Sequence, residues 1–314
     1  MEKVLLIVPD NNKGKFITKG YSSAFKELSY FVYEKKIYDI NINEINKISP
    51  DIIFIFWTGL SQKEIVNKFI QEYKNEKSLF IHTSENSDEI PKGYINSVRH
   101  YIFSNDSKIK KYRLKTGISA IDYKSKFSGY RYNITFAGNP AFIHREELLS
   151  KLVYNFGPIN IFCRSFDFYK SLEEIQESNL LNEYFIELYK QSYKGYVENQ
   201  KELADIFISS KVNLDFESMY PKEINYRCLE ILTAGGFLIS EYNENIIKYF
   251  DEGKEFEIFR DSDDLIDKIN FYFKNLNIAQ MIAVKGRRNA VNNFSYTDIL
   301  KSILKVVYGK DISS

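Results

Sequence analysis

Short apolar runs, rich in β-branched and aromatic residues, alternate along this chain with longer segments that show the apolar spacing of helices. Parallel sheets covered by helices produce this alternation, because a helix usually carries the chain back across the sheet between two parallel strands. The pattern therefore predicts an α/β fold. The chain has 314 residues, which is long for one compact domain and suits two domains of roughly 120–170 residues each.

The first half of the chain contains the elements of one Rossmann-like domain, expected over residues 1–125. Its predicted strands are 4–8, 52–57, 79–82, 101–104 and about 118–123. Its predicted helices lie near 20–32, 61–75 and 105–115. The stretch 123–133 has neither a helical nor a strand period and is rich in small, basic and aromatic residues, so it is the best candidate for the link between domains.

The second half shows the same alternation and predicts another Rossmann-like domain over 132–295. Its predicted strands are 133–137, 159–163, 204–214, 237–240 and 255–259. Its predicted helices lie near 143–154, 180–192, 223–234, 243–250, 262–274 and 277–292. A last amphipathic helix is expected over 296–308, and its apolar face needs cover. That face is formed by Ile299, Leu300, Ile303, Leu304 and Val307.

The charge balance and the length of the apolar runs exclude several partners. Lys and Arg total 43 against 42 for Asp and Glu, so the chain has no overall field to hold nucleic acid or an anionic membrane, and phosphate binding must be local. The initial apolar run ends at Pro9, and the run at 52–57 is far shorter than the roughly 20 residues of a membrane span. We expect a cytoplasmic protein without a transmembrane segment.

The residues that usually bind metals are few and scattered. The only cysteines, Cys163 and Cys228, lie in apolar surroundings, which is typical of core positions. The three histidines, His82, His100 and His144, do not have the spacing of metal ligands. We therefore expect neither a protein-bound metal nor another cofactor.

Three common motifs are absent: the glycine-rich dinucleotide fingerprint, the P-loop and the serine nucleophile elbow. Their absence argues against a dinucleotide oxidoreductase, a P-loop nucleotidase and a serine hydrolase. An Asp-Ser-Asp sequence does occur at 261–263, and such a pair holds the donor's cation in some sugar transferases. Here it begins a predicted helix, so we expect it to cap that helix.

The stretch YPKEINYRCLEILTAGGFLISEY, residues 220–242, is the most informative. A helix from about residue 223 would place Glu223, Arg227 and Glu230 on one polar stripe. Gly235 and the next glycine would end that helix before a buried strand. The start of such a helix faces the crevice where α/β folds bind ligands, and it favours phosphate. Taken alone, the spacing favours a simpler interpretation, an ion pair between Glu223 and Arg227 on a solvated face.

The chain resembles a known family in several segments that occur in the expected order. Residues 224–269, INYRCLEILTAGGFLISEYNENIIKYFDEGKEFEIFRDSDDLIDKI, resemble the C-terminal signature of the CgeB-like, glycosyltransferase-group-1 family. ITFAGNPAFIHREELLSKL at 134–152 is similar to the start of that family's donor domain. YKGYVENQKELADIFISSKVNLDF at 193–216 and KGRRNAVNNFSYTDIL at 285–300 are similar to its later elements. The resemblance covers about 134–308.

The resemblance implies the GT-B architecture, in which two Rossmann-like domains face a cleft. Residues 1–125 would bind the acceptor, 132–295 would bind a nucleotide-diphosphate sugar, and 296–314 would return to the N-terminal domain. The implied reaction moves a hexose-like sugar to a glycan, a protein or a cell-envelope precursor, without a metal. Closure of the two domains would accompany it.

The family pattern also implies roles for individual residues. Glu230 would bond the ribose hydroxyls, because a carboxylate accepts from two vicinal hydroxyls at once. Arg227 would meet the diphosphate and act in catalysis by neutralising the leaving nucleotide. The turn at 138–139 would let the backbone approach the phosphates, and Arg145 would add a second positive charge there. The loop at 196–197 would flank the base. The donor-binding residues implied besides Glu230 and Arg227 are Gly138, Asn139, Arg145, Tyr196, Val197, Asn225 and Gly235.

One position departs from the pattern of related retaining enzymes, which often carry two glutamates eight positions apart. Eight residues before Glu230 stands Lys222, with Glu223 next to it. The contact to the transferred sugar is therefore unassigned, and either stereochemical outcome is open, with retention as the preferred expectation.

The acceptor side has fewer signals. The loop 11–20 contains Gly14 and Lys15, a composition that suits a substrate loop and equally an ordinary connection. His82 and Glu85 follow a predicted strand end and are candidates for a general base if the reaction inverts, although a histidine at such a place is more often structural. Two other functions are open: an inactive transferase-like scaffold subunit, and a nucleotide-sugar epimerase on the same architecture.

Overall fold

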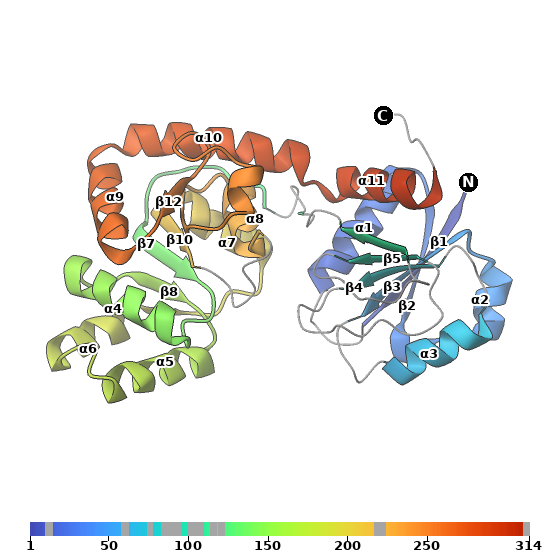
Figure 1. Ribbon diagram of the computed structural model, residues 1–314, viewed down its shortest axis with the longest axis horizontal. Coiled ribbons are helices and arrows are strands. Elements are labelled where there is room, and N and C mark those ends of the chain that lie inside the picture. The colour runs from blue at the N-terminus through green and yellow to red at the C-terminus, as the bar shows by residue number, and fades with distance from the viewer. Residues whose placement is uncertain are drawn as a thin grey trace. The chain divides into compact units, whose positions relative to one another are not determined.

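The computed structural model describes residues 1–9, 15–57, 63–73, 78–82, 96–99, 110–113, 118, 123–216 and 224–309 (Figure 1). The chain divides into two compact units. The first unit consists of residues 1–119 and 294–314, and the second unit consists of residues 120–293. Within the described residues each unit contains a six-stranded sheet, and the strands of both sheets pair in parallel, which confirms the predicted α/β fold.

The first sheet has the strand order β2-β1-β3-β4-β5-β6. The strands are β1 (Lys3–Val8), β2 (Phe31–Lys36), β3 (Ile52–Trp57), β4 (Ser78–His82), β5 (Asn96–Arg99) and β6 (Lys110–Arg113). Alternate residues of a strand point to opposite faces of the sheet. The inner positions of β1 and β3 are all apolar, so these strands contribute to a hydrophobic core on each face. Val4 and Phe54 belong to one core, and Leu5 and Ile55 to the other.

Helices cover both faces of this first sheet. They are α1 (Lys15–Glu27), α2 (Ile42–Ile48), α3 (Lys63–Glu72) and the last helix of the chain, α11 (Tyr296–Tyr308). Ile299, Leu300, Ile303 and Leu304 of α11 are buried in the same core as Phe25 of α1. Figure 1 shows α11, in red, beside the blue α1. The C-terminal helix is therefore part of the first unit.

Gly20 of α1 is required by this packing. A Cβ atom at Gly20 would lie 2.1 Å from Cε2 of Tyr296, which is far closer than two carbon atoms can approach. The aromatic ring of Tyr296 also packs on Tyr21, with the ring centroids 5.0 Å apart. The small residue thus lets the first turn of α11 lie directly on α1.

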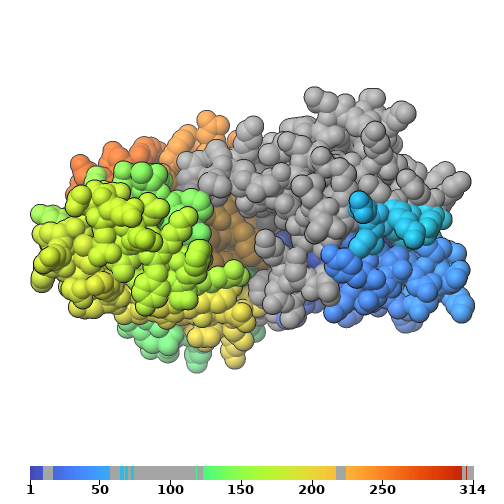
Figure 2. Space-filling view, turned by 90° about the horizontal axis from the view of Figure 1, so that it is seen from below, coloured from blue at the N-terminus to red at the C-terminus, as the bar shows by residue number. Residues whose placement is uncertain are grey.

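The second sheet has the order β12-β11-β10-β7-β8-β9. Its strands are β7 (Tyr132–Ala137), β8 (Asn160–Phe162), β9 (Tyr193–Gly195), β10 (Ser210–Asp215), β11 (Leu238–Glu241) and β12 (Glu257–Phe259). Its helices are α4 (Ile143–Phe156), α5 (Ser165–Glu177), α6 (Glu183–Gln191), α7 (Gln200–Ile208), α8 (Tyr226–Ala234), α9 (Ser262–Lys274) and α10 (Leu276–Asn293). The yellow-green residues of α5 and α6 form a continuous surface of this unit (Figure 2).

The predicted strand at 204–214 is wrong in its first half. Residues 200–208 form α7, and the strand β10 begins only at Ser210. The side chain of Asn199 caps the helix by accepting from the backbone N–H groups of Lys201 and Glu202. Leu203 and Phe207 lie four residues apart and are both buried, as on one face of a helix. One apolar run thus spans two elements, and the run alone does not show where the first ends.

Other elements also differ from the predictions. The helix predicted at 20–32 ends at Glu27, and the edge strand β2 follows it. Most residues of β2 are exposed, so it lacks the apolar run that marks a buried strand. The strand β6 lies within 105–115, where a helix was predicted. The sequence did not predict α5 or β9. In place of the helix predicted at 243–250 there is a short 3-10 turn at Ile246–Lys248. The strand predicted at 101–104 lies outside the described residues.

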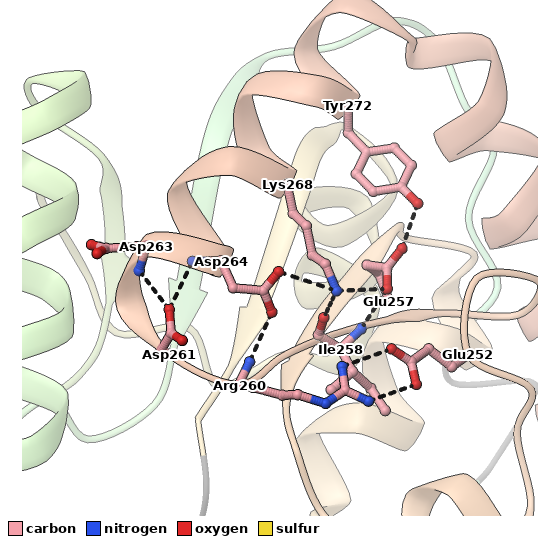
Figure 3. A network of polar contacts seen from close by, with 9 residues as sticks. All are labelled: Glu252, Glu257, Ile258, Arg260, Asp261, Asp263, Asp264, Lys268 and Tyr272. Carbon is pink, nitrogen blue, oxygen red and sulfur yellow. Dashed lines mark hydrogen bonds and ion pairs between the residues drawn. The ribbon is translucent and has the colours of Figure 1, made fainter.

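The expected capping role of the Asp-Ser-Asp sequence is confirmed. A carboxylate oxygen of Asp261 accepts from the backbone N–H of Asp263 at 3.0 Å and of Asp264 at 2.9 Å. Farther along α9, Lys268 Nζ lies 3.2 Å from Glu257 Oε1, and Tyr272 donates to Glu257 Oε2 at 2.6 Å (Figure 3). These contacts join α9 to the edge strand β12. No helix among the described residues has the length and apolarity of a membrane span.

Candidate functional site

A cavity of about 230 Å³ lies in the second unit, at the carboxyl ends of β7, β8 and β9. Its walls come from five segments and consist of Ala137, Gly138, Asn139, Phe162, Cys163, Arg164, Asp167, Tyr196, Val197, Leu203 and Arg227. The carboxyl edge of a parallel sheet is where α/β folds bind ligands, because the loops that follow the strands meet there. Predicted donor-site residues from three separate segments therefore line one cavity.

The turn after β7 is held by hydrogen bonds. The backbone N–H of Gly138 donates to the carbonyl of Phe162 at 3.1 Å, and the Asn139 side chain accepts from the N–H of Ala141 at 2.8 Å. Arg145, in the first turn of α4, donates from Nη1 to the carbonyl of Asn139 at 2.8 Å. Arg145 does not line the cavity. In this structure its guanidinium holds the turn in place.

Tyr196 and Val197 follow the short edge strand β9 and form another wall. The Tyr196 side chain is 52% exposed, and the guanidinium carbon of Arg164 lies 5.3 Å from the centre of its ring. A cation over an aromatic ring is attracted by the negative face of the ring. The pair presents both a flat aromatic surface and a positive charge in the wall of the cavity.

The helix α8 begins later than predicted, at Tyr226, and Asn225 is its N-cap. The Asn225 side chain accepts from the backbone N–H of Arg227 at 3.2 Å and donates to Asp215 Oδ1 at 2.7 Å. Cys228 Sγ donates to the other oxygen of Asp215 at 2.9 Å. Asp215 is the last residue of the central strand β10. The sheet and the first turn of α8 are therefore linked through one carboxylate.

Asp215 is 5% exposed, and its surroundings set its titration. Burial raises its pKa to about 6, against the lowering effects of the Cys228 hydrogen bond and of the guanidinium groups of Arg145 and Arg227. Burial also raises the pKa of the Cys228 thiol. The desolvation of the carboxylate thus outweighs the nearby positive charge.

Glu230 and Arg227 lie on neighbouring turns of α8 and form an ion pair. Arg227 Nη1 is 2.6 Å from Glu230 Oε2, but the pair lacks the alignment of a hydrogen bond, so this buried nitrogen has no hydrogen-bond partner among the described residues. The second oxygen of Glu230 accepts from the hydroxyl of Tyr123. Glu230 is only 7% exposed, which differs from the solvated helix face of the simpler interpretation.

Several predicted residues lie elsewhere or outside the described part. Gly235 has a φ of 86° and ends α8. Gly235, Asn225 and Glu230 do not line the cavity. Gly14, Glu85, Lys222 and Glu223 lie outside the described residues. For Lys15, the first residue of α1, and His82, the last of β4, only the backbone is described.

Sequence reasoning missed Tyr123, Arg164 and Asp167. Arg164 and Asp167 follow β8, a strand that the sequence did predict. Polar residues directly after a predicted parallel strand were therefore an available signal for this wall of the cavity. Tyr123 stands where the predicted strand 118–123 meets the unpatterned stretch 123–133, and neither pattern indicates a contact with α8.

Comparison with known proteins places the chain in a family. A family described as glycosyl transferase-like matches residues 145–305, about half of the chain. The chain belongs to this family. The matched residues of this glycosyl transferase-like protein include Arg145, Tyr196, Arg227 and Glu230. The match is broader than the CgeB-like group that the sequence resembles.

Solved structures share the fold of this glycosyl transferase-like protein at low sequence identity. A glycosyltransferase from Rickettsia africae is 13% identical with a TM-score of 0.68, and the alignment covers 98% of each chain. HepE from Anabaena, in complex with UDP-glucose, is 10% identical with a TM-score of 0.66, covering 99% of this chain and 100% of that one. A sucrose-phosphate synthase from Thermosynechococcus elongatus is 9% identical with a TM-score of 0.69, covering 98% and 99%. No curated protein sequence matches significantly.

These likenesses show the fold, the GT-B architecture of two Rossmann-like domains. Among the described residues, no three His, Cys, Asp or Glu side chains form a group that could hold a metal ion.

Proposed function

We propose that this protein transfers a hexose-like sugar from a nucleotide-diphosphate sugar, bound in the second unit, to a glycan, a protein or a cell-envelope precursor. We further propose that the reaction needs no metal and that the protein belongs to the CgeB-like group. The cytoplasmic location stays a prediction from the sequence.

One observation carries this proposal: Arg227 lines the cavity, and its buried Nη1 is ion-paired with Glu230 but makes no hydrogen bond among the described residues. Its N–H groups therefore have hydrogen-bonding capacity that the protein leaves unused. A phosphate oxygen of a bound ligand would supply the missing acceptor and would match the planar fork of the guanidinium. In a glycosyl transferase-like family, the fitting ligand is the diphosphate of an activated sugar.

The other walls of the cavity support the same assignment. Arg164 adds a second positive charge, and Tyr196 offers a flat ring on which a nucleobase can stack. Glu230 does not line the cavity, but it lies one turn along α8 from Arg227, and its carboxylate can accept from two ribose hydroxyls. Because HepE was solved with UDP-glucose, UDP is the first nucleotide to test.

The chemistry expected of these groups is electrostatic. The bond between the anomeric carbon and the β-phosphate oxygen breaks, and the nucleoside diphosphate leaves with the electron pair. The acceptor oxygen forms the new glycosidic bond and loses its proton to a base. Arg227 would offset the charge that builds on the leaving diphosphate. The identity of the base, for which His82 and Glu85 are candidates, and the preference for retention stay predictions.

The proposal is tested by incubating the protein with UDP-, GDP- and ADP-sugars and a mixture of glycan and peptide acceptors, in the presence of EDTA. Release of free nucleoside diphosphate that depends on the acceptor is the expected result. Calorimetric binding without turnover would instead support the scaffold alternative. A changed sugar still attached to its nucleotide would support the epimerase. Turnover that needs added Mg²⁺ or Mn²⁺ would contradict metal independence.

A further inference from the structure

Tyr123 makes a contact that no assigned role explains. Its hydroxyl donates to Glu230 Oε1 across 107 positions of the sequence. Both side chains belong to the second unit, and both are buried, with 1% of Tyr123 and 7% of Glu230 exposed. A buried charged group holds its geometry through such partners, because moving away from them leaves the charge unpaired.

We propose that Tyr123 is a positioning residue of the donor site, whose hydroxyl fixes the Glu230 carboxylate in the orientation that accepts the two hydroxyls of a ribose. This inference rests on the proposed function. An ionised carboxylate has about four lone-pair directions. The Tyr123 hydroxyl occupies one of them on Oε1, and Arg227 faces Oε2 as an ion pair without the alignment of a hydrogen bond. Each oxygen therefore keeps at least one direction for a ligand.

The backbone that carries Tyr123 is itself fastened. Residues 124–131 form neither helix nor strand, yet the Ser125 hydroxyl donates to the carboxylate of Asp205 in α7. Arg131 donates from Nη2 to the carbonyl of Asp205 at 3.0 Å and from Nε to the Ser209 hydroxyl at 3.2 Å. The backbone N–H of Arg131 also donates to the carbonyl of Ser209 at 2.8 Å. Tyr123 therefore approaches Glu230 from a segment held at several points.

The two partners of Glu230 act differently on its orientation. Arg227 lies on the same helix as Glu230 and has a long side chain. If Arg227 were the only partner, the carboxylate could rotate until both of its oxygens faced the guanidinium fork. Tyr123 comes from outside α8 and has a rigid ring, so it restrains one oxygen. Without the Tyr123 hydroxyl, the carboxylate would pair more closely with Arg227 and would offer the ribose fewer acceptor directions.

The test compares Tyr123→Phe with Tyr189→Phe. Tyr189 is also fully buried in the second unit, and its hydroxyl shares a hydrogen bond of 2.9 Å with Ser171 and not with Glu230. Calorimetry would give the Kd of each variant and of the parent for UDP, GDP and ADP and for their 2′-deoxy forms. Thermal unfolding of all variants would check that both substitutions leave the fold intact.

The expected result is specific to the ribose. Tyr123→Phe should raise the Kd of the ribonucleotide by roughly three- to tenfold and raise the Kd of the 2′-deoxy form, which keeps only the 3′-hydroxyl, by a smaller factor. The preference for ribose over deoxyribose should therefore fall. Tyr189→Phe should keep the parental preference. A merely structural hydrogen bond would weaken both nucleotides equally or neither, and either pattern in Tyr123→Phe would overturn the inference.

A Glu230→Ala variant separates this inference from the function on which it rests. If the parent prefers ribose, and Glu230→Ala loses that preference while Tyr123→Phe keeps it, the positioning role alone is wrong. If the parent binds none of the three nucleotides, or if Glu230→Ala keeps the preference, the proposed donor site fails and the role of Tyr123 fails with it.

Discussion

At the scale of single residues, the proposed site depends on two side chains of one helix. Glu230→Ala should remove charge-assisted hydrogen bonds worth roughly 1.5–3 kcal/mol and weaken UDP binding by about one to two powers of ten, while the fold survives. Glu252→Ala is the control, because Glu252 also pairs with an arginine of the second unit, Arg260, which does not line the cavity as Arg227 does. Titration calorimetry measures both. Equal UDP affinity in the parent and Glu230→Ala would remove Glu230 from the site.

Arg227→Ala should differ in kind. A cation beside the leaving diphosphate stabilises the charge that builds during the reaction, so kcat should fall by a larger factor than the affinity for UDP. Steady-state kinetics and calorimetry on the same preparation give both factors. A fall in affinity with kcat unchanged would mean that Arg227 only holds the ground state. Arg260→Ala is the matched control, and both of its parameters should stay at the parental values.

The residues predicted from the sequence and those found in the cavity overlap only in part. Gly138, Asn139, Tyr196, Val197 and Arg227 line it as a group. The first four follow strand ends, whose positions the sheet fixes, and Arg227 lies in the first turn of α8. Tyr123 was invisible to such reasoning, since its contact with Glu230 spans 107 positions and leaves no periodic signal. The burial of Glu230 was also unpredictable, because the spacing of residues on a helix shows which of them share a face but does not show what covers that face.

At the scale of elements, boundaries were harder to predict than types. The helix α9 lies at 262–274 as predicted, because Asp261 gives its start a clear cap. The helix α7 was missed because apolar residues continue from it into β10 without a break. A capping side chain is thus the local signal that shows where a helix begins. Asn199 is the comparable signal for α7, and the prediction did not use it.

Asp261→Ala should destabilise the second unit by about 1 kcal/mol, because two backbone N–H groups at the start of α9 lose their acceptor. Asp263→Ala is the comparison, since Asp263 lies in the first turn and its contribution as a charge near the helix dipole is roughly 0.3–1 kcal/mol at most. Urea unfolding followed by circular dichroism would measure the difference. A loss in Asp263→Ala as large as that in Asp261→Ala would show that charge, and not capping, matters there.

At the scale of the whole molecule, one buried acid should affect the pH dependence of stability. The pKa of Asp215 is raised from 3.8 to about 6 in the folded state, so between these values the folded chain binds the proton more tightly than the unfolded chain does. The Asp215 contribution is therefore most favourable below pH 4 and is lost as the pH rises through 6. The loss is on the order of 3 kcal/mol.

Asp215→Asn should remove this loss. Between pH 4 and pH 7 the free energy of unfolding of the parent, measured relative to Asp215→Asn, should fall by that amount. Urea unfolding at several pH values, with circular dichroism as the probe, would show it. Asp251→Asn, at an exposed position that pairs with Lys254, should follow the parental curve. Parallel curves for the parent and Asp215→Asn would contradict a raised pKa.

The placement of α11 has a consequence for the order in which the protein can be made. The first unit takes its core from residues at both ends of the chain, whereas the second unit is one continuous stretch, 120–293. A ribosome delivers residues in order, at roughly 5–20 per second. All residues of the second unit are thus synthesised before Ile299, Leu300 and Ile303, which complete the core that α1 and β1 share with α11. In nascent chains stalled with residue 293 just outside the ribosome, we expect protease to spare residues 120–293 and to cut residues 1–119.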